Sequence, residues 1–329
     1  MLRLIAITAL LLPTLAAAAA DSVPALTGDL RIHDPSVIVE DGHWVSFQTG
    51  DEGGLHQGAI KLKTSPDGIA WTNAGAIGKG VPTWTQEVLG YKSRNIWAPS
   101  AVKHGGKWYL YYSVSSFGIN VSTIGLMTND AFDPQAPEAG WVDQGMVLES
   151  GARDDFNAID PYRIDTTDGR AWLSYGSYWS GIKLRELDPE TGKLLSDDTP
   201  VHDIASRGRG AIEASSILEH DGRFYLFVSY DQCCQGVAST YRIMVGRADA
   251  ITGPYLGETG TDMLRSGASQ LQRTEGRFIG PGGQEPVFGA GRDMLAYHYY
   301  DGSELGVSKL QIVPIRWTED GWPVLPPPK

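Results

Sequence analysis

The chain has 329 residues, of which 42% are hydrophobic, 10% aromatic and 20% charged, and its net charge is −12. This hydrophobic content supplies a core and excludes disorder for most of the chain, and an acidic protein without long basic runs is not expected to bind nucleic acid. The 40 glycines and 19 prolines, together with the aromatic residues, favour strands and turns over helices.

The first 20 residues predict a secretory signal peptide, which leaves residues 21–329 as the mature protein. Arg3 lies in a short charged start, an apolar run extends from Leu4 to Leu15, and residues 16–20 are alanines that offer small-residue cleavage sites. An uncleaved anchor is the alternative, but the apolar run is short for a membrane span. We therefore expect a secreted or periplasmic protein that has no membrane contact after cleavage.

The mature chain contains five diverged copies of one strand–turn–strand unit. In each copy, a glycine turn of the Asp-Gly or Gly-Gly type joins a short alternating strand to a second strand rich in aromatic and β-branched residues. Successive copies start 64, 62, 53 and 72 residues apart, at Asp34, Ala98, Asp160, Glu213 and Glu285.

This spacing leaves room for two further strands in each unit. Residues 123–129, 182–187 and 242–248 are predicted third strands of four-stranded sheets. Repeated antiparallel sheets of this size indicate an all-β fold, a five-bladed β-propeller that closes as a single domain over residues 21–329. A β-sandwich, the alternative, would not explain five copies.

Four of the five unit starts carry a carboxyl group, and the starts of inner strands converge at one mouth of a propeller channel. A lone Asp-Pro commonly only initiates a turn, but converging like charges usually serve a function that needs shifted pKa values. Paired carboxyls beside aromatic residues are typical of glycosidic bond hydrolysis, where one protonates the leaving oxygen and the other activates water. A wide separation across the mouth would give inversion, and a third carboxylate would raise the pKa of the acid.

Aromatic and polar side chains near the unit starts are candidates for sugar contacts. Any single aromatic residue has a core position as its alternative, and any single polar residue is a weak signal. The candidate platforms are Trp97, Phe117, Tyr178 and Trp179, and the candidate hydrogen-bonding residues are Asn95, Asn157, Ser177 and Ser215.

Three further residues leave alternatives open. His298, in the fifth unit, could hold water or a metal in the channel or be a satisfied buried histidine, and it does not by itself indicate calcium, which prefers oxygen ligands. Cys233 and Cys234 are the only cysteines. A bond between them would close a strained eight-membered ring, and a metal site would need further ligands. Their redox state stays open.

At these residues the sequence resembles glycoside hydrolase family 43, specifically its endo-1,5-α-L-arabinanase branch. The matching segments span almost the whole mature chain, and their ordered set is more specific than any one of them. They are IHDPSVI (32–38), NIWAPS (95–100), YYSVSSFGINVSTIGL (111–126), FNAIDPY (156–162), SYWSGIKL (177–184), AIEASSI (211–217), CCQGVASTYRIMVGR (233–247) and YHYYDG (297–302).

The resemblance implies an inverting hydrolase that needs no cofactor for its chemistry. It assigns Asp34 as general base, Glu213 as general acid and Asp160 as the residue that orients the acid and raises its pKa. It also implies a calcium ion or water cluster at His298. Together with Phe117, the expected substrate contacts are Gly118, Asn157, Ala158, Ile159, Ser177, Tyr178 and Trp179.

One segment departs from the family pattern. Many members carry GPGHNS before the fifth inner strand, whereas this chain has GPGGQEPVF (280–288). Glu285 therefore lies where a neutral polar residue is commoner, which bears on the metal site and on outer subsites.

The leading hypothesis is an exported, monomeric endo-arabinanase that cleaves internal α-1,5 bonds in the arabinan side chains of pectin. An exo-acting arabinanase, or an arabinofuranosidase or xylosidase of the same fold, is the enzymatic alternative. A carbohydrate-binding propeller without catalysis is the alternative from another class, although binding alone needs no acid, base and modulator at converging positions.

Overall fold

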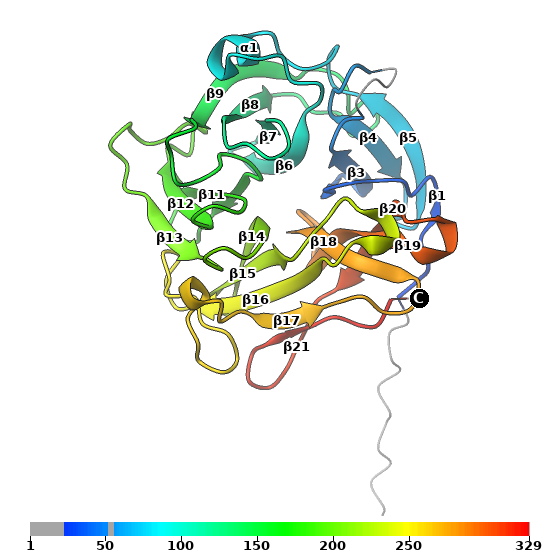
Figure 1. Cartoon of the computed structure of the whole chain (residues 1–329). Helices are drawn as coiled ribbons and strands as arrows, with labels where there is room; N and C mark the ends of the chain where they lie inside the picture. Colours follow the sequence, from blue (N-terminus) through cyan, green and yellow to red (C-terminus); the bar gives the residue numbers. More distant parts are fainter. Residues whose placement is uncertain (1–22, 52–55, 329) are drawn as a thin grey trace, which may run out of the picture.

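The computed structural model describes residues 23–51 and 56–328, and five sheets in it are arranged in a ring (Figure 1). The fold is the predicted five-bladed β-propeller, with the first strand of each blade at the centre. The predicted signal peptide, residues 1–20, lies outside the described residues. No helix within the described ranges is long and apolar enough to cross a membrane.

Blades 2, 3 and 4 each contain four antiparallel strands in sequence order. Blade 2 consists of β6 (Trp97–His104), β7 (Lys107–Val114), β8 (Ser122–Asn129) and β9 (Val142–Ser150). Blade 3 consists of β10 (Tyr162–Asp165), β11 (Ala171–Tyr175), β12 (Ile182–Leu187) and β13 (His202–Ala205). Blade 4 consists of β14 (Ile212–His220), β15 (Arg223–Tyr230), β16 (Arg242–Ala248) and β17 (Ser269–Gln272).

Blades 1 and 5 carry the two ends of the described chain. Blade 1 consists of β2 (Ser36–Glu40), β3 (His43–Gln48), β4 (Lys61–Ser65) and β5 (Ala70–Ala76), with β1 (Thr27–Gly28) parallel to β5 at its outer edge. Blade 5 consists of β18 (Phe278–Pro286), β19 (Met294–Asp301) and β20 (Val307–Pro314). A small hairpin follows, formed by β21 (Arg316–Trp317) and β22 (Pro323–Val324).

The predicted third strands are confirmed, since β12 and β16 have the predicted bounds and β8 begins one residue earlier. The predicted hairpin turns also have the expected backbone: both residues of Asp41-Gly42, Gly105-Gly106 and Asp221-Gly222 have positive φ. The helical elements of the described chain are short. They are α1 (Trp84–Leu89) and the 3-10 turns η1 (Gly236–Ala238), η2 (Met263–Arg265) and η3 (Gly302–Glu304).

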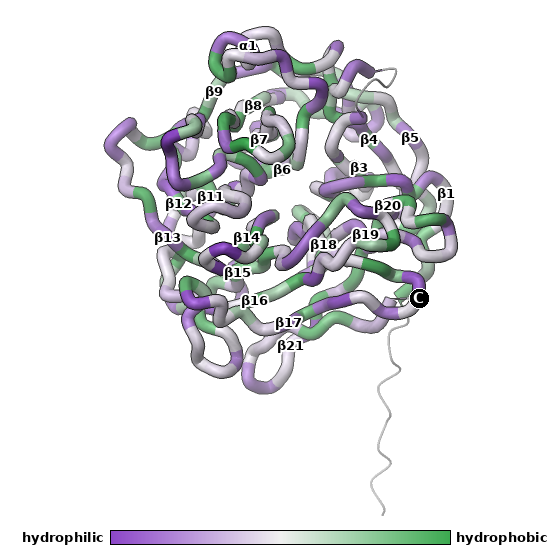
Figure 2. Tube along the Cα trace, viewed as in Figure 1, coloured by the Kyte–Doolittle hydropathy of each residue, from purple (hydrophilic) through white to green (hydrophobic). Residues whose placement is uncertain are grey.

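The hydrophobic core lies between the blades. Five clusters of buried side chains each join two neighbouring blades, and Figure 2 shows hydrophobic residues along the strands and hydrophilic ones in many connecting turns. Tyr112 of blade 2, for example, packs in one cluster with Val45 and Phe47 of blade 1. Because each blade is stabilised by both neighbours, the ring positions its inner strands firmly at the centre.

The ring closes where the segment before β2 pairs with β20. Arg31 forms an antiparallel bridge with Lys309, the Ile32 amide donates to the Ser308 carbonyl at 3.1 Å, and the Leu310 amide donates to the Leu30 carbonyl at 2.9 Å. The N-terminal segment thereby supplies the missing outer strand of blade 5.

Replacing Ile32 with alanine should lower the free energy of unfolding by about 2–5 kcal/mol. Ile32 is buried in the cluster that joins blades 1 and 5, so the truncation leaves a cavity at the closure. Denaturant unfolding of the variant measures the loss, with Val201→Ala at an exposed site as the control. A loss as small as that of the control would contradict this account of closure.

Candidate active site

Five residues with left-handed backbone, one from each blade and each lying in its first strand or just before it, line a small cavity at the centre of the propeller. They are Asp34 (φ 49°), Ala98 (φ 40°), Asp160 (φ 56°), Ala214 (φ 52°) and Gly283 (φ 59°). Because this conformation is costly for residues other than glycine, its recurrence identifies these five as the structurally equivalent positions.

The amide of each of these five residues donates to a side chain. In four cases the acceptor comes from the second strand of the preceding blade or directly follows it: Asp34 to His298 Nδ1 (3.2 Å), Ala98 to Thr49 Oγ1 (2.9 Å), Asp160 to Ser113 Oγ (2.9 Å) and Gly283 to Ser229 Oγ (3.0 Å). In the fourth blade, the corresponding place after β11 is taken by Gly176, which has no side chain. The Ala214 amide donates instead to Asp160 Oδ2 at 3.0 Å. This hydrogen bond holds the Asp160 carboxylate next to the backbone that follows Glu213.

These positions correct one prediction from the sequence. Glu213 and Glu285 were expected to be equivalent to Asp34 and Asp160, but Ala214 and Gly283 take those places. Glu213 lies one residue before its equivalent position and Glu285 two residues after. The pairing register is irregular between Glu213 and Ser216 and between Gly282 and Glu285, and alignment by charge alone misses such shifts.

Asp34 is held as an ionised carboxylate. Its Oδ2 accepts hydrogen bonds from His33 Nδ1 at 2.8 Å and from Thr49 Oγ1 at 2.6 Å. Burial by itself raises the pKa of Asp34, but the charge and hydrogen bond of His33, with help from His298 and Thr49, hold that pKa well below its usual range. The carboxylate is therefore available to accept a proton from water.

Glu213 has the opposite tendency. Burial raises the pKa of its carboxyl, and the negative charge of Asp34 adds to this rise. The hydroxyls of Ser177 (2.6 Å to Oε2) and Tyr241 (to Oε1) donate to the carboxylate and oppose the rise. The net shift is upward, so Glu213 keeps a proton at a higher pH than an ordinary glutamate.

Asp160 completes the group. Burial raises its pKa well above the usual value, and the charges of Glu213 and Asp34 raise it further. Two buried carboxyls that repel each other do not ionise together readily, so Asp160 and Glu213 behave as a pair that retains a proton. One ionised and one protonated carboxyl function are the combination that acid–base hydrolysis requires.

Replacing Ser177 with alanine should move the alkaline limb of the pH profile of kcat/KM to higher pH. The Ser177 hydroxyl stabilises the ionised form of Glu213, so its removal raises the pKa of Glu213 and keeps the acid protonated to a higher pH. Kinetics across the pH range measure the shift. An alkaline limb that moves to lower pH would contradict the assigned direction.

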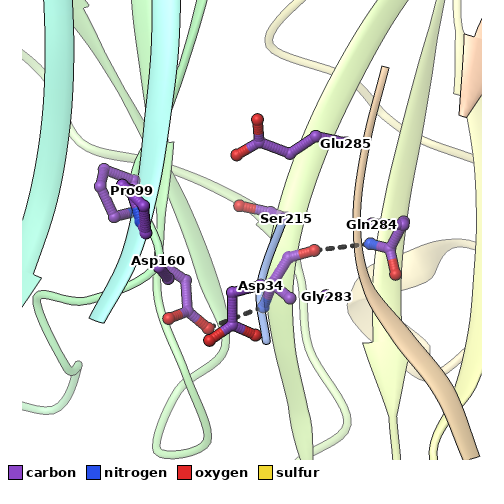
Figure 3. A pocket seen from close by; sticks show the side chains of 10 residues that line it. Asp34, Pro99, Asp160, Ser215, Gly283, Gln284 and Glu285 are labelled. Atoms are coloured by element: carbon purple, nitrogen blue, oxygen red, sulfur yellow. Dashed lines mark hydrogen bonds between the residues drawn. The ribbon is translucent and has the colours of Figure 1, made fainter. Parts of the chain in front are cut away.

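Glu285 lies at the other end of the small central cavity from Asp34 and Asp160 (Figure 3). Burial raises the pKa of Glu285 to about 8, against opposing hydrogen bonds with Ser36 and Ser100. Its carboxyl is therefore neutral at pH 7. Although the segment GPGGQEP (280–286) differs from the usual family pattern, its Glu285 side chain is neutral, like the polar residue that is commoner there.

The three carboxyl residues Asp34, Asp160 and Glu213 line one cleft of about 1000 Å³ to which all five blades contribute. Phe117 is 73% exposed and its ring lies 5.0 Å from that of Trp97, centroid to centroid. Seven of the eight expected substrate contacts line the cleft: Phe117, Gly118, Asn157, Ile159, Ser177, Tyr178 and Trp179.

Ala158 is the exception among the expected contacts. It is fully buried in the cluster between blades 2 and 3 and is not among the residues that line the cleft. The Ile159 amide donates to the Asn157 carbonyl at 3.0 Å, which closes a tight turn centred on Ala158. Asn157 and Ile159, on either side of this turn, line the cleft, while Ala158 packs into the core.

Sequence reasoning assigned no role to several residues that shape the site. Tyr241 contacts the acid, while His33 and Thr49 hold the base. Tyr241 and His33 lie within matched segments, which was the available signal. Cys233 and Cys234, whose redox state the sequence left open, form a disulfide that lines the cleft.

His298 is fully buried behind the base. Its Nδ1 accepts the Asp34 amide, its ring stacks on His33 at 3.9 Å between centroids, and its Nε2 has no hydrogen-bond partner among the described residues. Burial and the nearby His33 hold the pKa of His298 well below its usual value. The ring is therefore neutral and, because Nδ1 is an acceptor, Nε2 carries the proton.

The fold and the site together define a glycoside hydrolase. The chain belongs to the family described as Glycosyl hydrolases family 43, whose sequence profile matches residues 24–323.

Proteins of this family with known names resemble the chain over most of its length. The extracellular endo-α-(1→5)-L-arabinanase 1 of Bacillus subtilis is 40% identical over 89% of this chain and 87% of its own. The extracellular exo-α-(1→5)-L-arabinofuranosidase ArbA of Cellvibrio japonicus is 36% identical over 89% and 85%. A solved family 43 endo-arabinanase from Bacillus licheniformis has a TM-score of 0.85 and 41% identity over 92% of this chain and 100% of its own. Both named relatives are extracellular, which supports the predicted secreted or periplasmic location.

Proposed function

We propose that this protein is an inverting endo-1,5-α-L-arabinanase that hydrolyses internal bonds of linear arabinan. The observation that carries the proposal is the opposite pKa shifts of Asp34 and of the Glu213–Asp160 pair in one cleft. The similarity to endo-arabinanases supports the choice of substrate. All of these groups come from one chain, so we also propose that it acts as a monomer.

The proposed reaction is a single displacement. Asp34 accepts a proton from a water molecule whose oxygen attacks the anomeric carbon, and Glu213 gives its proton to the leaving glycosidic oxygen as the C–O bond breaks. Asp160, which accepts the Ala214 amide, fixes the backbone next to the acid and keeps the proton on the pair. Thr49 and His33 both donate to Asp34 Oδ2, so we propose that Oδ1 accepts the proton of the attacking water.

The cleft walls suit a neutral sugar chain. Phe117 packs on Trp97 and offers an exposed ring to the C–H face of a furanose, while Ser177 and Asn157 offer polar groups to hydroxyls. The cleft also extends to Arg31 and Ser308 beyond the base. Walls on both sides of the carboxyl groups favour binding within a chain rather than at its end.

No cofactor is needed for this chemistry. The donor set at His298 does not fit direct ligation of a metal, since Nδ1 accepts an amide and Nε2 carries the proton. We propose that His298 donates to a channel water, and that a calcium ion, if bound, is held through water. Because the proposed proton transfers use only the carboxyl groups of Asp34, Glu213 and Asp160, adding a chelator should leave kcat unchanged.

The early products on linear arabinan test endo action. A ladder of oligosaccharides should form from the start, and ¹H NMR of the first products should show the β-anomer, because a single displacement inverts the α-bond. One short product from the outset would favour the exo alternative. Arabinan binding without any hydrolysis would favour the non-catalytic propeller.

A further inference from the structure

Large apolar and sulfur-containing side chains with left-handed backbone conformation are found in the cleft. Among the described residues, the apolar and sulfur-containing side chains larger than alanine with positive φ are Tyr178, Trp179, Cys234 and Leu305. All four line the cleft. This conformation strains any residue with a Cβ, and such strain gathers at functional sites. Tyr178 and Trp179 are expected sugar contacts. Cys234 and Leu305 resemble them in two respects, since both have positive φ and both line the cleft.

The Leu305 side chain buries almost no apolar surface in the folded protein, and its backbone is strained. It ends the turn η3 with φ 55° and is 95% exposed. Glycine or asparagine is the usual residue at such a position, and a leucine here is both strained and in contact with water. A ligand that covers its side chain would account for its presence.

The loop after β15 and the turn before β20 form a single surface. Their backbones meet at Gly236 and Gly306, where a Cβ on Gly306 would lie 2.4 Å from the Val237 nitrogen. The Cys234 amide also donates to the Tyr300 hydroxyl at 2.7 Å. These contacts fix the disulfide and Leu305 relative to each other, and we call Cys233, Cys234 and Leu305 the blade 4–5 wall.

We propose that the blade 4–5 wall is a sugar-binding subsite that contacts the C–H face of one arabinofuranose unit of the substrate. The inference rests on the proposed function for the identity of the sugar. Sulfur atoms and a leucine side chain offer an apolar, polarisable surface without hydrogen-bonding demands, which suits the C–H face of a neutral furanose. Phe117 and Trp179, from blades 2 and 3, line the same cleft and are the expected contacts for other units of the same substrate.

Replacing Leu305 with asparagine tests the subsite. Asparagine tolerates left-handed backbone, so the melting temperature should stay the same or rise. The lost apolar contact should raise KM for linear arabinan about 3- to 10-fold, with kcat within about twofold. Leu195→Asn, at a leucine that is 53% exposed and outside the cleft, is the matched control and should leave KM unchanged. An unchanged KM in Leu305→Asn would overturn the proposal.

The disulfide gives a second, independent test. The double variant Cys233→Ser, Cys234→Ser should raise KM and make binding weaker still when combined with Leu305→Asn. An unchanged KM in the serine variant would overturn the assignment of the disulfide to the subsite.

Binding measured without hydrolysis separates this proposal from the proposed function. In a Glu213→Gln background, Leu305→Asn should reduce the retardation of the protein in gels that contain linear arabinan. Retardation that depends on Leu305, in a protein that never hydrolyses arabinan, would reject the proposed function and retain the subsite. If hydrolysis is normal and Leu305→Asn does not change the retardation, the subsite is rejected and the proposed function is retained.

Discussion

Glu213→Gln should lower kcat on linear arabinan by about 10²- to 10⁴-fold, the usual contribution of a positioned general acid. Glutamine keeps the size of the side chain. The Ser177 and Tyr241 hydroxyls donate to different oxygens of Glu213, so the amide oxygen of glutamine can accept from one of them while its NH2 group donates to the other. It has no proton to give to the leaving oxygen. Steady-state kinetics on linear arabinan measure the loss.

The leaving group distinguishes the loss of an acid from a general disturbance of the site. An aryl arabino-oligosaccharide with an acidic phenol as leaving group needs little protonation, so Glu213→Gln should lose much less activity on it. Binding in arabinan-containing gels should be retained. If kcat on arabinan fell by less than tenfold, Glu213 would not be the acid.

Asp34→Asn should cause a loss of similar size, about 10²- to 10⁴-fold in kcat, for a different reason. The amide cannot accept the proton of the attacking water, and it also removes the charge that pairs with His33. The same kinetic assay measures the loss, and folding is checked by the melting temperature.

An acidic leaving group should not rescue Asp34→Asn, because the missing step is the activation of water. Azide, which needs no base, should restore turnover and give the β-arabinosyl azide. Rescue by the phenol substrate but not by azide would exchange the roles of Asp34 and Glu213. Near-full activity of either variant would reject the assigned mechanism.

The fold could be predicted because the propeller repeats one unit. The periodic turns at Asp41-Gly42 and Asp221-Gly222 and the strands over 182–187 and 242–248 carry local signals, and local signals are what a single sequence contains. Closure by residues 30–32 has no such signal. It joins segments almost 280 positions apart, and only the three-dimensional ring brings them together.

The candidate site was predicted in part, for a comparable reason. Asp34 and Asp160 stand at equivalent positions and were found by the repeat. Glu213 was aligned by its charge, while the backbone places Ala214 in that position, and the shift depends on an irregular pairing register. Contacts such as His33 Nε2 to the Tyr300 hydroxyl, 2.9 Å apart, join the first and last blades, and no pattern along the chain reports them.

The pairing of the N-terminal segment with β20 also sets when the protein can finish folding. Residues 30–32 can pair only after β20 has been synthesised and is free to fold. The ring therefore closes late, and pairings between segments so distant in sequence form slowly. The base depends on the same event, because the Asp34 amide donates to His298 of blade 5. The catalytic geometry is therefore complete only after the C-terminal blade has packed against the N-terminal segment.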